Sequence, residues 1–461
     1  MSEGRCNAVM SEGRCKAVMS EGRCNVERIE KCGFADLLPY LLENRPVIIT
    51  KEAAVTKDWR VDASFFLDPQ YSPLVMNDVK IPVDISIGSS SVVTRSTMTY
   101  DVFLSRLLHA SDNDEILYGK DFHLDALLFG SIEEQEKFYL VPDCFKDDWL
   151  NDYCQWKRIQ DYKFAYIGGK ASFTHLHHDV LASFSWSINL SGIKYWCLWS
   201  PDESNDNDDD LDVDLNAPMY AFEQHSGEAV FVPSGWYHSV GNSQDELTVS
   251  INRNWFNAFS IVKVFEFLIK EWNLVKNELS HLLTPSSKEK DVEFKDQMTQ
   301  FSSSCVRMSF VEWSLQCESI MQANAAMNWL VFLELLSSKL VLYDTVCYKN
   351  LAQVKEGEIE EPKPVWCTLF CPHYCPRTFL QRRDYELVEQ QQIATIGKDG
   401  TSVWIFTCAQ ISRVLKLMMQ HELLIIHIAI IFGKTAEEII YQLKTMERKI
   451  QELSRMRNSF L

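Results

Sequence analysis

The sequence predicts a mainly β fold with α-helical additions. Between Tyr162 and Trp255, short segments rich in aromatic and β-branched residues alternate with turn residues, as in KFAYIGG, FSWSINL, KYWCLWS, EAVFVPS and LTVSINRNW. Such spacing is typical of a β-sandwich or a barrel. After Trp255 the apolar period becomes helical, because Ile261, Phe265, Leu268, Trp272 and Val275 recur at steps of three and four residues. We therefore expect a β domain followed by helices.

The segments before the β region predict a mixed N-terminal part. FADLLPYLL (residues 34–42) has a helical pattern, and PVIIT (46–50) is typical of a buried strand. Residues 71–130 mix short strands with a helix near Tyr100–His109. These elements precede the barrel or sandwich and are expected to pack on it.

Three nine-residue copies open the chain, starting at Met1, Met10 and Met19. Solenoid repeats need about 20 residues or more per unit, and these copies are short and polar, so we expect a disordered tail. We divide the chain into this tail (1–27), a β domain with its N-terminal elements (28–256), a helical extension packing on the barrel (257–345), and a C-terminal region of uncertain fold (346–461).

The C-terminal region has two features whose role the sequence does not decide. A helix that starts with the capping-box pair Thr435 and Glu438 has Ile439, Leu443, Met446, Ile450 and Leu453 at a mean spacing of 3.5 residues. This short coiled-coil pattern predicts either packing within its own domain or weak self-association. A cluster of Cys367, Cys371, His373 and Cys375 has zinc-type ligands but lacks the distant second pair of most structural zinc sites. A further helix is expected over about Ala325–Tyr343.

Composition restricts the classes of partner. The net charge of −19 and the absence of a Lys/Arg-rich run argue against direct nucleic-acid binding. The charge either suits a basic protein partner or only keeps the protein soluble. The N-terminus lacks the apolar core of a signal peptide, and the 14 cysteines are scattered, so we expect a cytoplasmic protein, with the nucleus as the alternative. The longest apolar run, Leu423–Phe432, is about half a membrane span, which predicts a buried helix and no membrane association.

The segment SFTHLHHDV carries the chemistry. His177 and Asp179 are two residues apart, and such residues share one face of a strand, so both can reach one metal ion. His238, just after the turn in VFVPSGWYH, supplies a third ligand from a distant strand. Two histidines and one carboxylate form the facial triad of non-haem Fe(II) enzymes, which leaves three positions for a 2-oxo acid and O2.

Two neighbouring histidines and one lysine could also belong to this site. By strict alternation His175 shares the face of His177 and could replace it as ligand, whereas His178 faces away; we prefer His177. Lys194 lies in GIKYW on an otherwise apolar strand, and a buried lysine is unfavourable unless an anion pairs with it. The distal carboxylate of 2-oxoglutarate is a suitable partner, and a surface lysine on an edge strand is the alternative.

These motifs together resemble the small JmjC-domain oxygenases. The resemblance rests on H-x-D, VLASFSWSINLSGIKYW, VPSGWYH and SINRNW, with support from ENRPVII, ILYGKDFHL and DDWLNDY, and it covers roughly residues 30 to 325. It implies a double-stranded β-helix of the jelly-roll or cupin type, with Fe(II) on His177, Asp179 and His238. It also implies that Lys194 pairs with 2-oxoglutarate and that Thr174, Tyr118 and Asn252 contact this co-substrate.

The resemblance also implies a reaction. Within the family it points to the branch that hydroxylates a lysine of the eukaryotic translation release factor, at C-4, with succinate and CO2 as co-products and ascorbate as reductant in vitro. His175 and His178 depart from the family pattern, in which a Pro and a small residue flank the first ligand. Two alternatives remain: a JmjC-type lysine demethylase with the same iron chemistry, and a barrel kept as a non-catalytic interaction module.

Overall fold

The structure is a computed structural model with two compact units, Met1–Ser260 and Ile261–Leu461. The residues that it describes are 26–31, 33–51, 56, 59–87, 92–109, 115–129, 132–201, 218–282, 309–352, 395–396 and 401–456. The nine-residue repeats and the cluster of Cys367, Cys371, His373 and Cys375 lie outside these residues.

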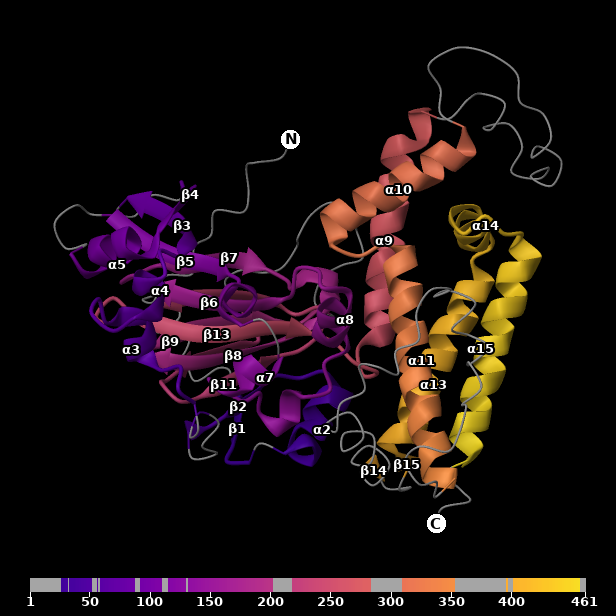
Figure 1. Ribbon diagram of the computed structural model, residues 1–461, viewed down its shortest axis with the longest axis horizontal. Helices are drawn as coiled ribbons and strands as arrows, with labels where there is room; N and C mark the ends of the chain where they lie inside the picture. The colour runs from indigo at the N-terminus through magenta and orange to yellow at the C-terminus, as the bar shows by residue number, and fades with distance from the viewer. Residues whose placement is uncertain are drawn as a thin grey trace. The chain divides into compact units, whose positions relative to one another are not determined.

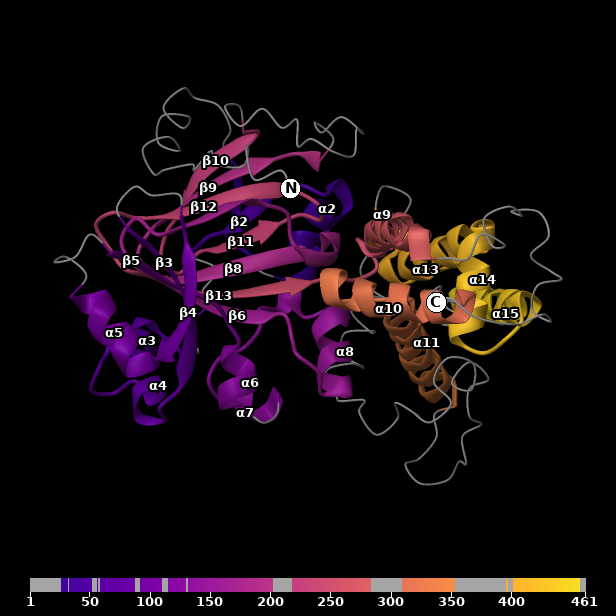
Figure 2. The ribbon, with the colours of Figure 1, turned by 90° about the horizontal axis from the view of Figure 1, so that it is seen from above.

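Two β-sheets form the first unit (Figure 1). In spatial order, the nine-stranded sheet contains β1 (Glu27–Ile29), β2 (Val47–Ile49), β11 (Ala229–Val232), β8 (Phe184–Ser191), β13 (Thr248–Trp255), β6 (Lys163–Gly168), β5 (Glu115–Phe122), β3 (Lys80–Ile87) and β4 (Thr94–Thr99). The four-stranded sheet contains β10 (Tyr220–Gln224), β9 (Lys194–Trp199), β12 (Tyr237–Asn242) and β7 (Phe173–His177). Figure 2 shows the smaller sheet facing the larger one.

The chain crosses repeatedly between the two sheets. From β6 to β9 it alternates between the large and the small sheet, it then pairs β9 with β10 inside the small sheet, and it alternates again through β11, β12 and β13. This winding is the double-stranded β-helix that the family resemblance implied. The predicted mainly β class with helical additions is therefore confirmed.

Apolar side chains fill one part of the space between the sheets. Trp196 and Leu198 of β9 and Val240 of β12 pack with Ile48, Val230 and Val232 of the large sheet. Alternation along each strand sends every second side chain into this core. The inward positions of β8 and β13 carry polar residues instead, and these residues face the site described below.

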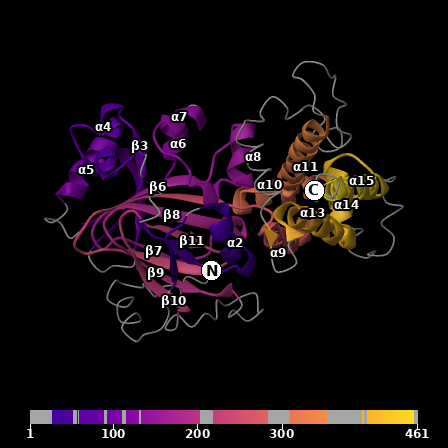
Figure 3. The ribbon, with the colours of Figure 1, turned by 90° about the horizontal axis from the view of Figure 1, so that it is seen from below.

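Helices cover the outer face of the large sheet, on the side away from β7, β9 and β10 (Figure 3). The first unit's helices are α2 (Phe34–Glu43), α3 (Ala63–Leu67), α4 (Pro73–Met76), α5 (Tyr100–Leu108), α6 (Leu124–Leu128), α7 (Ile132–Glu136), α8 (Trp149–Lys157) and the 3-10 turns η3 (Asp143–Phe145) and η4 (Val180–Ala182). The predicted helix 34–42, the strand 46–50 and the helix near Tyr100 correspond to α2, β2 and α5.

The second unit is helical. It contains α9 (Ile261–Leu279), η6 (Ser280–Leu282), α10 (Phe310–Ala325), α11 (Trp329–Ala352), the short strands β14 (Thr395–Ile396) and β15 (Thr401–Ser402), α13 (Val403–Gln420), α14 (Glu422–Ile431) and α15 (Ala436–Met456). The helix expected over about Ala325–Tyr343 is present as α11, but it begins at Trp329 and not near Ala325. Ala326 has a φ of 58° and ends α10, and the Asn328 side chain then accepts from the backbone N–H of Val331 as α11 begins.

The last helix starts with the predicted capping box. Thr435 N–H donates to the Glu438 carboxylate (2.7 Å), and Glu438 N–H donates to the Thr435 hydroxyl (3.1 Å). The five apolar residues at 3.5-residue spacing are all buried, and α15 packs on α13 and α14 within the unit. Among the described residues no single helix has the length and apolarity to cross a membrane, although α13 and α14, which meet at a bend of 95°, pass that test when joined.

Candidate active site

Three side chains of metal-ligating type meet at one end of the barrel. His177 is the last residue of β7, and His238 lies directly opposite it on β12 in the antiparallel ladder. Their ring centroids are 4.3 Å apart. Asp179 completes the group, and the potential ligand atoms of the three residues lie within 4.8 Å of one another. The structure thus brings together the three residues that the sequence analysis selected as iron ligands.

Asp179 does not lie on the strand, as the i, i+2 argument assumed. It follows the end of β7 and precedes the 3-10 turn η4, in which Leu181 (φ 59°) and Ala182 (φ 45°) adopt left-handed backbone conformations. Such conformations are unfavourable for residues with a Cβ and persist where surrounding contacts impose them. The Ser234 hydroxyl, from the turn between β11 and β12, donates to the Ala182 carbonyl and holds this loop beside the His238 strand.

Both imidazoles are oriented by the backbone. Nδ1 of His177 lies 2.8 Å from the His175 carbonyl oxygen, and Nδ1 of His238 lies 3.2 Å from that of Trp236. Because a carbonyl only accepts, each Nδ1 carries the proton, which leaves the Nε2 lone pair free for a metal. Burial, followed by the neighbouring His238, lowers the pKa of His177 to about 4, so this imidazole is neutral at physiological pH.

The Asp179 carboxylate is ionised. Burial raises its pKa, but the two histidines and hydrogen bonds from Ser185 and Asn254 outweigh this effect, so its pKa is lowered overall. Its Oδ2 is buried and has no hydrogen-bond partner among the described residues. A buried anionic oxygen without a partner, beside two available Nε2 atoms, is the donor set that a divalent transition metal requires.

A β-bulge separates His175 from this group. Val240 pairs with Thr174 and His238 pairs with His177, so two steps along β12 correspond to three along β7. The bulge breaks the strict alternation from which we expected His175 to share the face of His177. His175 instead contacts the Phe173 ring (4.7 Å between centroids) and lines a cavity of about 130 Å³ with Asp84, Ser86 and Lys120, among others.

Lys194 is buried inside the barrel. It is 2% exposed, and its Nζ reaches from β9 across to the Ser250 hydroxyl on β13. No carboxylate of the described residues forms an ion pair with it, and burial lowers its pKa to about 7. The surface-lysine alternative is therefore wrong. A buried cation without a protein counter-ion favours an anionic ligand.

The other residues implied in co-substrate binding also lie on the interior. The Tyr118 hydroxyl interacts with Thr174 and Asn242, and burial is the main reason that its pKa is raised to about 12. Asn252 accepts from the hydroxyls of Ser250 (2.8 Å) and Ser187 (3.2 Å). Lys194, Ser250 and Asn252 thus form one hydrogen-bonded chain across the barrel.

Sequence reasoning missed a polar ladder on β8 and β13. Its cross-strand pairs are Ser250 with Asn189, Asn252 with Ser187, and Asn254 with Ser185. The signal was present, because polar residues alternate with apolar or aromatic ones in both FSWSIN and TVSIN. Polar residues on the inward face of a barrel strand indicate a binding site rather than a core.

Comparisons with known proteins place these motifs in a family. A family model described as "JmjC domain, hydroxylase" matches residues 208–255. The 2-oxoglutarate and iron-dependent oxygenase JMJD4 of Homo sapiens is 30% identical over 352 residues, which cover 70% of this chain and 75% of the human one. The JMJD4 homolog of Drosophila melanogaster is 36% identical over 231 residues, 48% of this chain and 47% of the fly protein.

One plant relative is named as a demethylase. The Arginine-specific demethylase JMJ20 of Arabidopsis thaliana is 31% identical over 274 residues, which cover 50% of this chain and 58% of the plant protein. The aligned region spans about half of the fly relative and about three quarters of the human one. On the extent of the human match, the chain belongs to the JmjC family of 2-oxoglutarate and iron-dependent oxygenases.

Proposed function

We propose that this chain is an Fe(II)- and 2-oxoglutarate-dependent protein hydroxylase. The observation that carries the proposal is the cluster of His177, Asp179 and His238, with ligand atoms within 4.8 Å and an unpartnered buried carboxylate oxygen. These residues would hold the iron. When bound, iron with 2-oxoglutarate and O2 supplies oxidation of a C–H bond, coupled to formation of succinate and CO2.

The barrel residues position the co-substrate. The Lys194 ammonium, held by Ser250, would pair with the distal carboxylate of 2-oxoglutarate, while Thr174, Tyr118 and Asn252 would donate to or accept from its remaining polar atoms. The apolar core on one side of these groups limits access of water. Charge pairing in such an environment is stronger than in bulk water.

The proposed substrate is a lysine of the eukaryotic translation release factor, hydroxylated at C-4. The support is the resemblance of the quoted motifs to the branch with that activity, and the net charge of −19, which suits a basic target region. This proposal places the enzyme in the cytoplasm, where translation ends.

Demethylation is the second candidate. It is favoured by the Arabidopsis relative, whose name is Arginine-specific demethylase. Hydroxylation of an N-methyl group would release formaldehyde, whereas hydroxylation of a lysine side-chain carbon leaves the added oxygen on the protein. The two candidates therefore differ in product while sharing the metal site.

Mass spectrometry distinguishes these candidates. The full-length protein would be incubated with Fe(II), ascorbate, 2-oxoglutarate and the release factor's N-terminal domain. A gain of about 16 Da on one lysine, lost in His238→Ala, is expected for a hydroxylase that depends on iron. His175→Ala is the matched control, since this histidine lies next to the cluster but outside it, and it should retain iron binding.

Other results would overturn parts of the proposal. Formaldehyde from methylated peptides, without a mass gain on the release factor, would support the demethylase. Consumption of 2-oxoglutarate without either product would keep the oxygenase and remove both substrates. Bound iron with no turnover of any kind would support a non-catalytic interaction module.

A further inference from the structure

A cavity of about 130 Å³ lies between β3, β5 and β7, beside the metal cluster. Its polar lining includes Asp84 and Ser86 of β3 and Lys120 of β5. Apart from Tyr118, its lining residues take no part in the proposed binding of iron or 2-oxoglutarate. The cavity therefore provides space that the metal and the co-substrate do not account for.

Strand β7 connects the cavity with the metal cluster. His175 lines the cavity, and His177, two residues further along the strand, belongs to the cluster. Two residues of an extended chain span about 7 Å. Val93 in the cavity lining is 38% exposed, so the cavity is open to solvent. A polypeptide whose target residue reaches the cluster can thus place a nearby side chain in the cavity.

The charged side chains that line the cavity have opposite signs. Lys120 forms no ion pair with any described residue. The Asp84 carboxylate lies 3.6 Å from the guanidinium of Arg95, which is closer to the Asp121 carboxylate (2.9 Å). A ligand group with a net charge would meet a like charge on one side of the cavity. A neutral group that has a donor at one end and an acceptor at the other meets a complementary charge at both ends.

We propose that this cavity binds the side-chain carboxamide of an Asn or Gln in the protein substrate, about two residues from the oxidised one. The amide oxygen accepts from the Lys120 ammonium, and the amide nitrogen donates to the Asp84 carboxylate. The Ser86 hydroxyl can donate or accept. This inference rests on the proposed function, because it names a feature of the substrate on which the oxygenase acts.

The size and the apolar walls of the cavity suit such a side chain. Its volume of about 130 Å³ is roughly four times the share of one water molecule in the liquid, about 30 Å³. This space is sufficient for the few non-hydrogen atoms of an Asn or Gln side chain. The methylene part of the side chain packs against the apolar lining residues, which are Val93, Ile116 and Phe173.

Peptide binding to the full-length protein with Mn(II) and 2-oxoglutarate tests this assignment without turnover. The probes are fluorescent peptides with a central lysine and alanine elsewhere, in which the positions two residues to either side of the lysine carry Asn, Asp, Lys or Leu. Fluorescence anisotropy gives the Kd of each peptide. The Asn peptide is expected to bind about 10- to 100-fold more tightly than the others, as for a hydrogen bond to a charged group.

Two substitutions should change the preference and not only weaken it. Asp84→Asn leaves the Lys120 ammonium without an opposite charge in the lining, so the Asp peptide should now bind more tightly than the Asn peptide. Lys120→Met leaves the Asp84 carboxylate, so the Lys peptide should gain instead. Lys80→Met is the matched control, because Lys80 is an exposed lysine of β3 outside the cavity lining, and it should keep the wild-type order. If one cavity variant does not fold, the other decides.

The outcomes separate the cavity from the proposed function. Equal binding of all peptides by the wild type, or an unchanged order in the folded cavity variants, would overturn the carboxamide assignment. If the wild type still adds oxygen to the release factor, only this assignment is lost. A preference for the Asn peptide, in a protein that never consumes 2-oxoglutarate, would keep the cavity as a peptide site and overturn the proposed oxygenase.

Discussion

Replacing Lys194 with Met is expected to stabilise the apo protein and to abolish binding of 2-oxoglutarate. The Lys194 ammonium is buried with no carboxylate partner among the described residues, and burial lowers its pKa from 10.5 to about 7. A pKa lowered on folding means that the folded state disfavours the charged lysine relative to the unfolded chain. Met has a similar length and carries no charge, so it removes this unfavourable contribution.

The size of the effect follows from the pKa. A difference between 10.5 and about 7 corresponds to about 5 kcal/mol, because each pH unit is about 1.4 kcal/mol. This value is an upper limit, since Lys194 keeps a hydrogen bond to Ser250 that Met cannot make. We expect a net gain of about 1 to 4 kcal/mol, which for a unit of this size raises the melting temperature by at least about 2 °C.

The pH dependence has a definite sign. Below pH 7 the lysine is protonated in both the folded and the unfolded state, so the buried charge lowers the free energy of unfolding by its full amount. Lys194→Met therefore increases the free energy of unfolding most in this range. Between pH 7 and 10 the folded wild-type protein releases the proton while the unfolded chain keeps it, so the penalty declines. The stability difference between variant and wild type should therefore shrink as the pH rises.

Thermal and urea unfolding of the full-length protein measure this prediction. With Mn(II) already present at pH 6.5, addition of 2-oxoglutarate should raise the melting temperature of the wild type further but leave that of Lys194→Met unchanged. Lys163→Met is a matched control: Lys163 is also buried, but its Nζ lies 3.5 Å from the Asp125 carboxylate, so its removal should destabilise the protein. A Lys194→Met protein that is less stable than wild type at pH 6.5, or that is still stabilised by 2-oxoglutarate, would show that Lys194 is not an unpaired buried cation that binds this co-substrate.

Three further predictions concern other contacts. Glu318→Ala should reduce the free energy of unfolding by about 3 kcal/mol, because His427 would lose a buried partner at 2.8 Å; urea unfolding without a change in midpoint would contradict it. Asp125→Asn should destabilise by a similar amount, since it leaves the buried Arg253 guanidinium without its carboxylate, and a wild-type melting temperature would be inconsistent with this. Tyr118→Phe should raise the KM for 2-oxoglutarate several-fold at nearly constant kcat; an unchanged KM would remove Tyr118 from the co-substrate site.

Much of the barrel could be predicted because its physical signals are local. Alternation of aromatic and β-branched residues marked β6, β8, β9, β11 and β13, and a helical period with every predicted apolar position buried marked α9. The H-x-D spacing and the turn before His238 identified three residues that the fold brings within 4.8 Å. Local patterns were sufficient for these elements because the spacing of apolar residues within each one determines whether it forms a strand or a helix.

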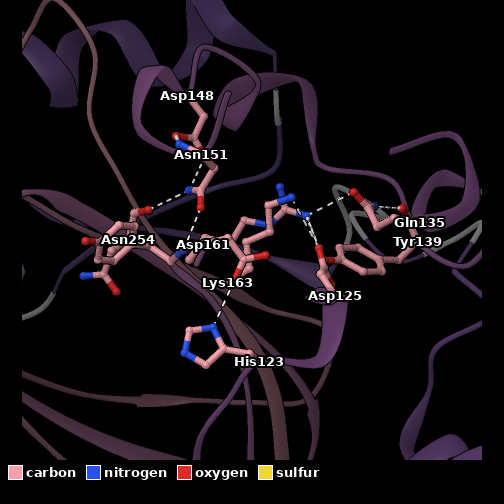
Figure 4. Close-up of polar contacts among 11 residues, drawn as sticks. His123, Asp125, Gln135, Tyr139, Asp148, Asn151, Asp161, Lys163 and Asn254 are labelled. Carbon is pink, nitrogen blue, oxygen red and sulfur yellow. Dashed lines mark hydrogen bonds and ion pairs between the residues drawn. The ribbon is translucent and has the colours of Figure 1, made fainter. Parts of the chain in front are cut away.

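Other features depend on tertiary context. The bulge between Thr174 and His177 is set by pairing with β12, so strict alternation placed His175 on the wrong face. The left-handed residues Leu181 and Ala182 are apolar and carry no turn signal of the Gly or Asn type. The break at Ala326 was missed for the same reason. The hydrogen bond from the Asn151 side chain to the Asn254 carbonyl oxygen (Figure 4) joins residues 103 positions apart, so no local sequence pattern predicts it.

We infer that His177, Asp179 and His238 hold an iron to which 2-oxoglutarate binds. An anaerobic titration of the full-length protein with Fe(II) and then 2-oxoglutarate tests it most directly, because chelation of Fe(II) by a 2-oxo acid produces a visible charge-transfer band. We expect this band to appear at one equivalent of each in the wild type and to be absent in His238→Ala and Asp179→Ala. A wild-type protein that shows no band, or an equal band in all three proteins, would mean that these residues do not hold the iron.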